Sequence, residues 1–221
     1  MPEGLINVNG SNVQTLEILF LTTLIALLPS LLVMMTSFTR IVISLSFLRT
    51  AMGTQQNPPN TVLIGISLFL TLFIMNPVLS DIKQNAYDPY TRQEITQQEA
   101  IERAKVPLKD FMLRQTEPSS IKMFCEMAGV DAPETTEEAS QLAMRVVIPS
   151  YMTSELKRAF EIGFLLYLPF LLIDIVVSST LMSMGMIMLP PAMISMPFKL
   201  LLFITVDGWQ LMFSSLVQGF N

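Results

Sequence analysis

The chain has 221 residues, of which 51% are hydrophobic and 14% charged, and its net charge is −5 at pH 7. It contains no histidine and one cysteine, Cys125, so histidine-based acid–base catalysis, zinc sites and disulfides within the chain are excluded. Basic clusters, glycine-rich phosphate loops and Gly-x-Ser-x-Gly motifs are absent, which argues against nucleic-acid binding and catalysis. We therefore expect no enzyme activity, no metal and no cofactor.

The N-terminal segment, residues 1–15, is polar. It lacks the basic region and the short apolar core of a secretory signal. Two alternatives remain open: the first apolar run acts as its own membrane-insertion signal, or a signal segment has been removed.

An N-terminal hydrophobic region, residues 16–79, follows. Its apolar runs, 16–35 and 61–79, are each close to the roughly 20 residues that cross a bilayer as a helix. Pro29 interrupts the first run, and a Pro-Pro pair places a loop between the two runs. Pro77 predicts the end of the second run.

A polar insert, residues 80–148, has twelve acidic against eight basic residues. Helix-forming residues are frequent at 93–105 and apolar residues recur at helical spacing around Leu108, which predicts a small helical domain outside the membrane. The connector between the first two apolar runs carries Arg40 and Arg49 and no acid, so the positive-inside rule predicts a cytoplasmic connector and a periplasmic insert. The insert is either an assembly element between the membrane halves or a binding site.

The C-terminal hydrophobic region, residues 149–221, contains charged residues inside its apolar runs. Those runs are 162–188 and 192–217. Asp174 lies in the first run, and Lys199 and Asp207 lie in the second, although a charge at mid-bilayer costs roughly 2.5–3.5 kcal/mol. Such residues form structural ion pairs or mark a pathway. Either the helices are kinked but span the membrane, or half-length helices fold back as hairpins covered by neighbouring subunits, and we favour the hairpins.

Further charges lie just before the third apolar run. Glu155 with Arg158, and Lys157 with Glu161, stand at spacings that favour pairs within one helix. An alternative is that Glu155 reaches Lys199 of a neighbouring copy and so fixes the register of a ring.

Methionines are concentrated in the break between the two C-terminal runs. The chain has 17 methionines, and the break carries Met182, Met184, Met186 and Met188, followed by Pro190 and Pro191. Methionine is flexible and polarizable, which suits a surface that must seal and then reshape around something variable. The alternative is that methionine serves only as a filler of the core of a membrane protein.

These patterns predict an all-α integral membrane protein with about four long hydrophobic helical segments, several of them kinked or folded as hairpins, and a small helical extramembrane insert. Three functions are open. The first is a subunit of a gated protein-conducting channel. The second is an intramembrane aspartyl protease using Asp174 and Asp207, although its expected Gly-x-Gly-Asp setting is missing. The third is a small-ion transporter, for which no inverted repeat is visible.

Several strings follow one another in the order found in a known protein family. They occupy residues 35–40, 53–54, 58–60, 73–77, 111–116, 153–156, 160–164, 185–191, 197–199 and 207–209. On these strings the chain resembles the FliP/SctR family of type III secretion export-gate proteins, from about residue 13 to its end. Two strings favour the flagellar branch over the injectisome branch. They are residues 111–116, which include Arg114, and the Leu-Pro-Pro after the methionines.

The resemblance implies a pentamer that joins FliQ-type and FliR-type subunits and other membrane proteins of the export apparatus in a closed gate. This gate would lie in the bacterial inner membrane at the flagellar basal body, and unfolded flagellar proteins would pass through its centre. The resemblance also implies a methionine gasket across the pore, with Met186, Ile187 and Met188 as its residues, Met182 and Met184 as further contributors, and Pro190 and Pro191 as breakers of the gate loop. Residues expected in buried or inter-subunit ion pairs are Arg114, Glu155, Asp174, Lys199 and Asp207.

Overall fold

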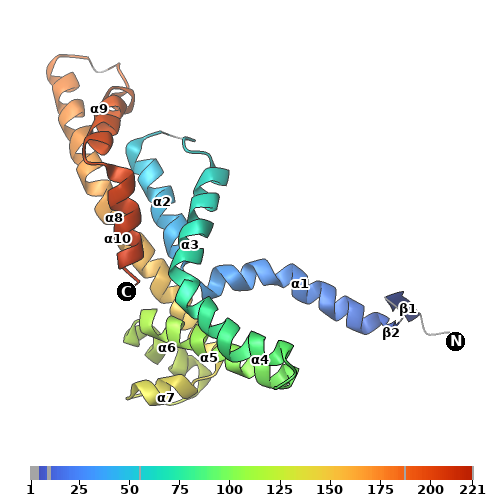
Figure 1. Cartoon of the computed structure of the whole chain (residues 1–221). Helices are drawn as coiled ribbons and strands as arrows, with labels where there is room; N and C mark the ends of the chain where they lie inside the picture. The colour runs from blue at the N-terminus through green and yellow to red at the C-terminus, as the bar shows by residue number, and fades with distance from the viewer. Residues whose placement is uncertain (1–4, 9–10, 55, 187, 221) are drawn as a thin grey trace.

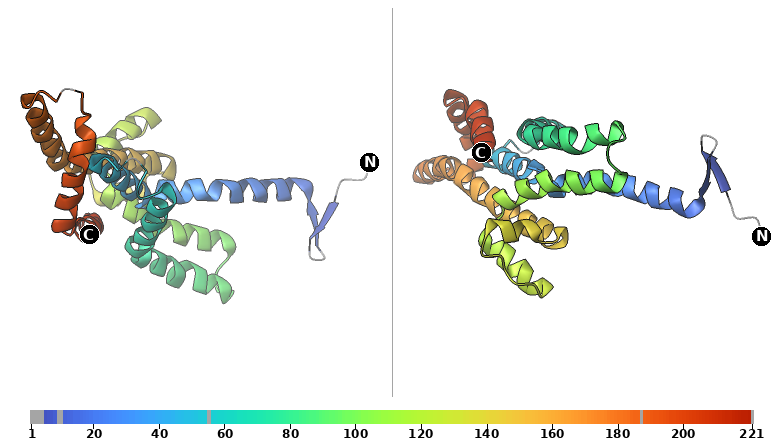
Figure 2. Two further views of the ribbon diagram at one scale, coloured as in Figure 1. Left: turned by 90° about the horizontal axis from the view of Figure 1, so that it is seen from above. Right: turned by 60° about the horizontal axis from the view of Figure 1, so that its bottom comes forward.

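The computed structural model describes residues 5–8, 11–54, 56–186 and 188–220. The described chain is mostly helical and confirms the predicted all-α membrane fold (Figure 1). A small antiparallel hairpin precedes the first helix, with β1 (Leu5–Val8) paired to β2 (Ser11–Gln14) so that Leu5 faces Gln14. This hairpin, which the sequence did not predict, lies at the outer end of the first helix, away from the other helices (Figures 1 and 2).

Three helices form the N-terminal region. α1 (Thr15–Met35) extends away from the other helices, whereas α2 (Phe38–Met52) and α3 (Asn60–Ile82) are part of the main bundle (Figure 2). α2 ends at Gly53, whose φ of 75° is in the left-handed region that glycine adopts readily. The loop that follows lies at the end of the molecule opposite the insert (Figure 1).

The predicted end of the second apolar run at Pro77 is wrong. α3 continues to Ile82 and passes through a π-helical turn, η1 (Lys83–Tyr87), into α4 (Asp88–Thr91), which makes a helix of 32 residues. A proline inside a helix removes one backbone N–H and bends the helix without having to end it. Figure 1 shows α3 changing direction along its length.

The insert contains three further helices, α5 (Gln97–Gln115), α6 (Pro118–Ala128) and α7 (Thr136–Gln141). α5 and α7 each begin with a Thr-x-x-Glu sequence, and the threonine hydroxyl accepts a hydrogen bond from the backbone N–H of the glutamate. The sequence therefore specifies both helix starts locally.

The C-terminal region consists of α8 (Met144–Ser183), α9 (Pro191–Thr205) and α10 (Gly208–Gln218). α8 is one continuous helix of 40 residues, so the third apolar run is not split into half-length helices as we expected. The fourth run is split, because α9 and α10 meet at a bend of 64°. α8 and the helix Asn60–Thr91 are long and apolar enough to cross a membrane, and the bent pair adds a third span if it counts as one. The apolar stretch Ile18–Leu31 of α1 is shorter.

The core forms where α2 packs along α8 and the insert joins them. Ile41 and Leu45 of α2 and Tyr151 of α8 have at most 1% of their surface exposed. Farther along the same interface, a Cβ atom on Gly163 would lie 2.5 Å from the ring of Phe47, so only glycine permits this close approach. Cys125 of the insert belongs to the same core, which unites the insert with the apolar helices.

The position of Cys125 predicts that it resists thiol reagents in the folded protein. The residue is fully buried, and burial raises the pKa of its thiol, so little thiolate forms. We expect maleimide to label the detergent-extracted chain only after unfolding. The variant Cys125→Ser with Met127→Cys is the control, because Met127 is 75% exposed and should label at once. Rapid labelling of Cys125 in the folded chain would contradict this packing.

Candidate functional site

The methionine-rich break is a loop at the tip of a helical hairpin. α8 ends at Ser183, and Gly185, two residues later, has a φ of 74°. The N–H of Met186 donates to the carbonyl of Leu181 at 2.9 Å and the N–H of Gly185 donates to that of Met182 at 3.0 Å, the two bonds of a Schellman motif. Pro190 caps α9 and Pro191 is its first residue, where the missing N–H costs nothing. Glycine thus ends one helix and proline starts the next.

The methionine side chains of this loop point away from the core of the chain. Met182 and Met184 are 62% and 64% exposed, Met186 is 43% exposed and Met188 is 95% exposed. Ile187 lies outside the described residues. Figure 1 places the loop at the end of the molecule opposite the insert. The structure therefore presents a flexible apolar surface at the tip of the hairpin.

One buried ion pair lies below this loop, between the two helices of the hairpin. Lys199 of α9 donates to the carboxylate of Asp174 in α8 at 2.6 Å and to the backbone carbonyl of Ala51 in α2 at 3.1 Å. Ser195 donates to the other oxygen of Asp174 at 2.6 Å. Lys199 has 5% of its surface exposed, so this pair joins three helices in an otherwise apolar region.

A second buried ion pair lies near the insert. Arg40 of α2 donates from Nε to Glu155 of α8 at 2.9 Å and makes a second bond from Nη2 to the same carboxylate. The two side chains are 3% and 0% exposed. A bidentate arginine–carboxylate contact of this kind is geometrically specific as well as strong.

The guanidinium of Arg40 also binds the insert and the end of α10. Nη2 donates to the side chain of Gln115 at 3.2 Å and Nη1 donates to the carbonyl of Gly219 at 3.1 Å. Its central carbon lies 3.7 Å from the ring centre of Phe220, a cation–π contact. Gln115 donates to the carbonyl of Phe220 at 3.1 Å and accepts from Arg158 at 2.9 Å. This network joins α2, α5, α8 and the residues after α10.

Within one chain, Glu155 pairs with Arg40 and Lys199 pairs with Asp174, and the pairing of Glu155 with Lys199 of a neighbouring copy stays a prediction. Glu155 is fully buried. Lys157 lies 4.0 Å from Glu161 within α8, as its spacing indicated, and 2.7 Å from Glu117 at the start of α6. The hydrogen bond from Lys157 lowers the pKa of Glu117.

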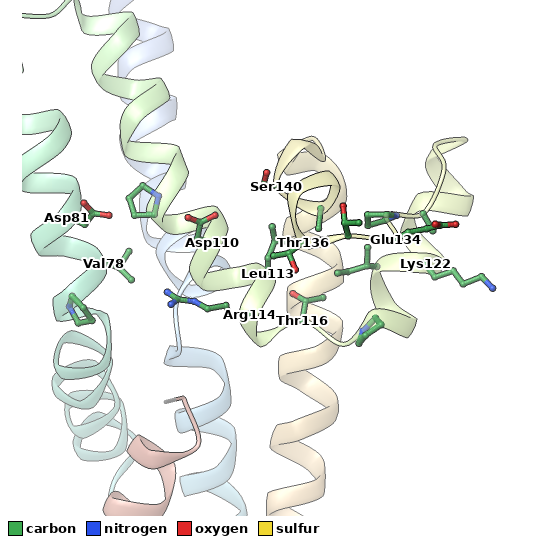
Figure 3. A pocket seen from close by; sticks show the side chains of 18 residues that line it. Val78, Asp81, Asp110, Leu113, Arg114, Thr116, Lys122, Glu134, Thr136 and Ser140 are labelled. Carbon is green, nitrogen blue, oxygen red and sulfur yellow. The ribbon is translucent and has the colours of Figure 1, made fainter.

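Asp207 and Arg114 make no ion pair among the described residues. Asp207 is exposed at the bend between α9 and α10. Arg114 is exposed in the wall of a cavity of 1010 Å³ between α3 and the insert (Figure 3). Asp81 and Asp110 lie near it on the same side of the cavity, and Glu134 lies on the other side. Within the described part of the chain, no group of three or more aspartate, glutamate or cysteine residues could hold a metal ion.

Sequence reasoning missed Arg40, Gln115, Ser195 and Phe220. The positive-inside rule counts Arg40 as a charge of a cytoplasmic connector. In the structure, Arg40 lies in the first turn of α2 and is buried near the insert. Its position inside a helical, partly apolar stretch could have suggested burial. Gln115, Ser195 and Phe220 carry no comparable signal, because their partners are distant in sequence.

Comparisons with known proteins agree on one family. The FliP family model matches residues 21–216. A flagellar biosynthetic protein FliP of Pectobacterium carotovorum subsp. carotovorum is 50% identical over 214 residues, covering 96% of this chain and 82% of that protein. Proteins of the same name from Aquifex aeolicus and Bacillus subtilis are each 48% identical, covering 96% and 94% of this chain and 88% and 92% of their own lengths.

The buried pair of Arg40 and Glu155 predicts a large loss of stability when one partner is removed. Arg40→Leu leaves the Glu155 carboxylate buried without its cation, which typically costs about 3–5 kcal/mol. We expect the midpoint of unfolding in detergent to fall accordingly, and the double variant with Glu155→Leu to recover part of the loss.

The matched control is Arg103→Leu, because Arg103 pairs with Glu99 at the surface of α5 with both side chains about half exposed. Exposed pairs contribute only about 0–1 kcal/mol. Equal effects of Arg40→Leu and Arg103→Leu would show that the buried network is not a major source of stability.

Proposed function

This chain belongs to the FliP family, and we propose that it is a subunit of the flagellar protein export gate, a channel for unfolded flagellar proteins across the inner membrane. The observation that carries the proposal is the methionine loop. Exposed methionines stand at the tip of a hairpin whose helices are apolar and whose ends are defined by glycine and proline. A surface of this kind can seal a pore and deform when a chain passes.

In the proposed gate, Met186, Ile187 and Met188 form the gasket, and Met182 and Met184 contribute to it. Met188, at 95% exposed, has no cover within its own chain and is free to meet the same loop of other copies. A β-branched isoleucine has fewer rotamers than methionine, so the seal is less pliable at position 187. Pro190 and Pro191 keep the loop from continuing either helix.

The apolar exterior supports assembly with other chains. Phe69 and Phe73 of α3 and Ile204 of α9 are between 69% and 78% exposed, so lipid or other subunits must cover them. We place the chain in a pentamer with FliQ-type and FliR-type subunits and other membrane proteins of the export apparatus, in the inner membrane at the basal body.

The proposed orientation keeps the insert on the periplasmic side. Arg40 no longer supports it, because this residue is buried near the insert. The orientation therefore rests on Arg49 alone, which holds the α2–α3 loop by donating to the carbonyl of Pro58 and the side chain of Asn60.

We propose no enzymatic activity. An aspartyl protease would need Asp174 and Asp207 to share a proton across one site. Asp174 instead binds Lys199 and Ser195, and Asp207 is exposed at the helix bend.

Replacing the exposed methionines of the loop should open a leak. We expect Met186→Ala and Met188→Ala to raise ion permeability of the membrane in cells that assemble the complex, because a smaller side chain leaves the pore unsealed. Met127→Ala is the matched control, since this methionine is exposed but belongs to the insert. Unchanged permeability in both loop variants would count against the gasket.

Assembly can be tested without any transport assay. Native mass spectrometry of the detergent-extracted chain, alone and with FliQ-type and FliR-type subunits, should give a discrete pentamer that acquires both partners. A stable monomer that ignores both partners would contradict the proposed gate.

A further inference from the structure

The junction between α9 and α10 has the backbone of a hinge. Val206 and Asp207 separate the two helices, and Asp207 adopts φ 54° and ψ 48°, a left-handed conformation that few non-glycine residues accept without strain. Its side chain is exposed and the helices on either side are bent by 64°. The change of direction is thus concentrated in this junction of two residues.

Close packing across the bend supports this local geometry. A Cβ atom on Gly208 would lie 2.2 Å from the ring of Phe203, so the end of α9 lies directly on the start of α10. Phe203 also meets Trp209 edge to face, with ring centres 5.2 Å apart. A Cβ atom at this position would force the Phe203 ring to move, so glycine permits the packing seen in the bent state.

The far side of the hinge is fixed. The residues directly after α10 are bound by their backbone carbonyls, Gly219 to Arg40 and Phe220 to Gln115, and the Phe220 ring packs on the Arg40 guanidinium. Both binding residues belong to the buried network near the insert. α10 is accordingly anchored at the end that faces away from the methionine loop.

The near side of the hinge has few polar attachments to other helices, although Phe203 belongs to the core and Leu200 packs against it. Among the described residues, the side-chain hydrogen bonds from α9 to other helices come from Ser195 and Lys199, to Asp174 of α8 and to the Ala51 carbonyl of α2. Ala51 lies in the last turn of α2, where backbone carbonyls lack partners within the helix and a cation is favourable. Lys199 therefore connects the mobile side of the hairpin to the end of α2.

We propose that α9 and the methionine loop move as one unit about Asp207 and Gly208, and that Lys199 is the latch that holds this unit in the closed position. The proposal rests on the gate function proposed above and extends it, since it assigns Lys199 as a positioning residue for the gasket. α10 and the buried network near the insert stay in place while α9 moves.

The hinge can be tested by distances within the full chain. In a Cys125→Ser background, spin labels at Met193→Cys in α9 and Leu211→Cys in α10 occupy positions that are 70% and 59% exposed. Labelled chains are diluted into unlabelled chains of the assembled complex. Double electron–electron resonance then reports the distance between the two spin labels of one chain. We expect one narrow distance population for the parent, a second population for Lys199→Met, and a return toward the parent for Lys199→Arg.

Two controls separate the latch from general damage. Lys105→Met removes a lysine of an exposed ion pair in α5 and should leave the distances unchanged. Gly208→Ala tests the hinge with the latch intact and should shift the distances, whereas Gly65→Ala, where an added Cβ meets nothing within 4 Å, should not. If Lys199→Met does not assemble, the distances in Gly208→Ala still test the proposed hinge.

The two proposals fail in different ways. If both Lys199→Met and Gly208→Ala give the same distances as the parent, the proposed hinge is wrong. A leak caused by Met186→Ala in the same strain would still support the proposed gate. If Lys199→Met shifts the distances, the proposed hinge is supported. If neither Lys199→Met nor Met186→Ala then causes a leak, only the proposed gate function is wrong.

Discussion

The rest of the structure depends on one buried arginine. Arg40 neutralises Glu155, and its remaining donors reach Gln115 of the insert and the carbonyl of Gly219. A guanidinium can bind three other segments at once because it carries five donors in a fixed plane. Without it, the Glu155 carboxylate, the Gln115 amide and the Gly219 carbonyl would lack their common donor. The insert and the apolar helices are therefore a single folded unit.

Two ion pairs lie at different distances from the methionine loop, and we assign them different roles. Near the insert, the arginine network joins parts that are far apart in sequence and fixes their relative positions. Near the methionine loop, Lys199 makes fewer bonds and its partner Asp174 is 30% exposed. We expect motion to be concentrated around the Lys199 pair, which has fewer buried hydrogen bonds than the arginine network. The free energy of local opening is lowest where the fewest buried bonds must break.

Much of this architecture could be predicted from the sequence, and the exceptions have physical causes. The apolar runs, the helical insert and the break with Gly185 and Pro190 are local patterns, so they were predictable. Pro77 was misleading because a proline can bend a helix as well as end it. Arg40 and Glu155 are 115 positions apart, and no local pattern connects them. The positive-inside rule uses the sequence alone and takes no account of burial, so it includes Arg40 among the loop charges.

The length of α8 has a consequence for how the complex meets the bilayer. A helix of 40 residues is about 60 Å long, about twice the roughly 30 Å thickness of the hydrocarbon layer. Upright, such a helix projects about half its length beyond the lipid tails, while exposed apolar residues such as Phe164 and Leu172 continue along its middle. The exposed large apolar residues of α8 run from Leu156 to Met182, about 39 Å along the helix axis, which is more than the roughly 30 Å hydrocarbon thickness. The mismatch favours a particle whose height above the membrane is set by protein neighbours, so that the surrounding bilayer adapts to the assembly.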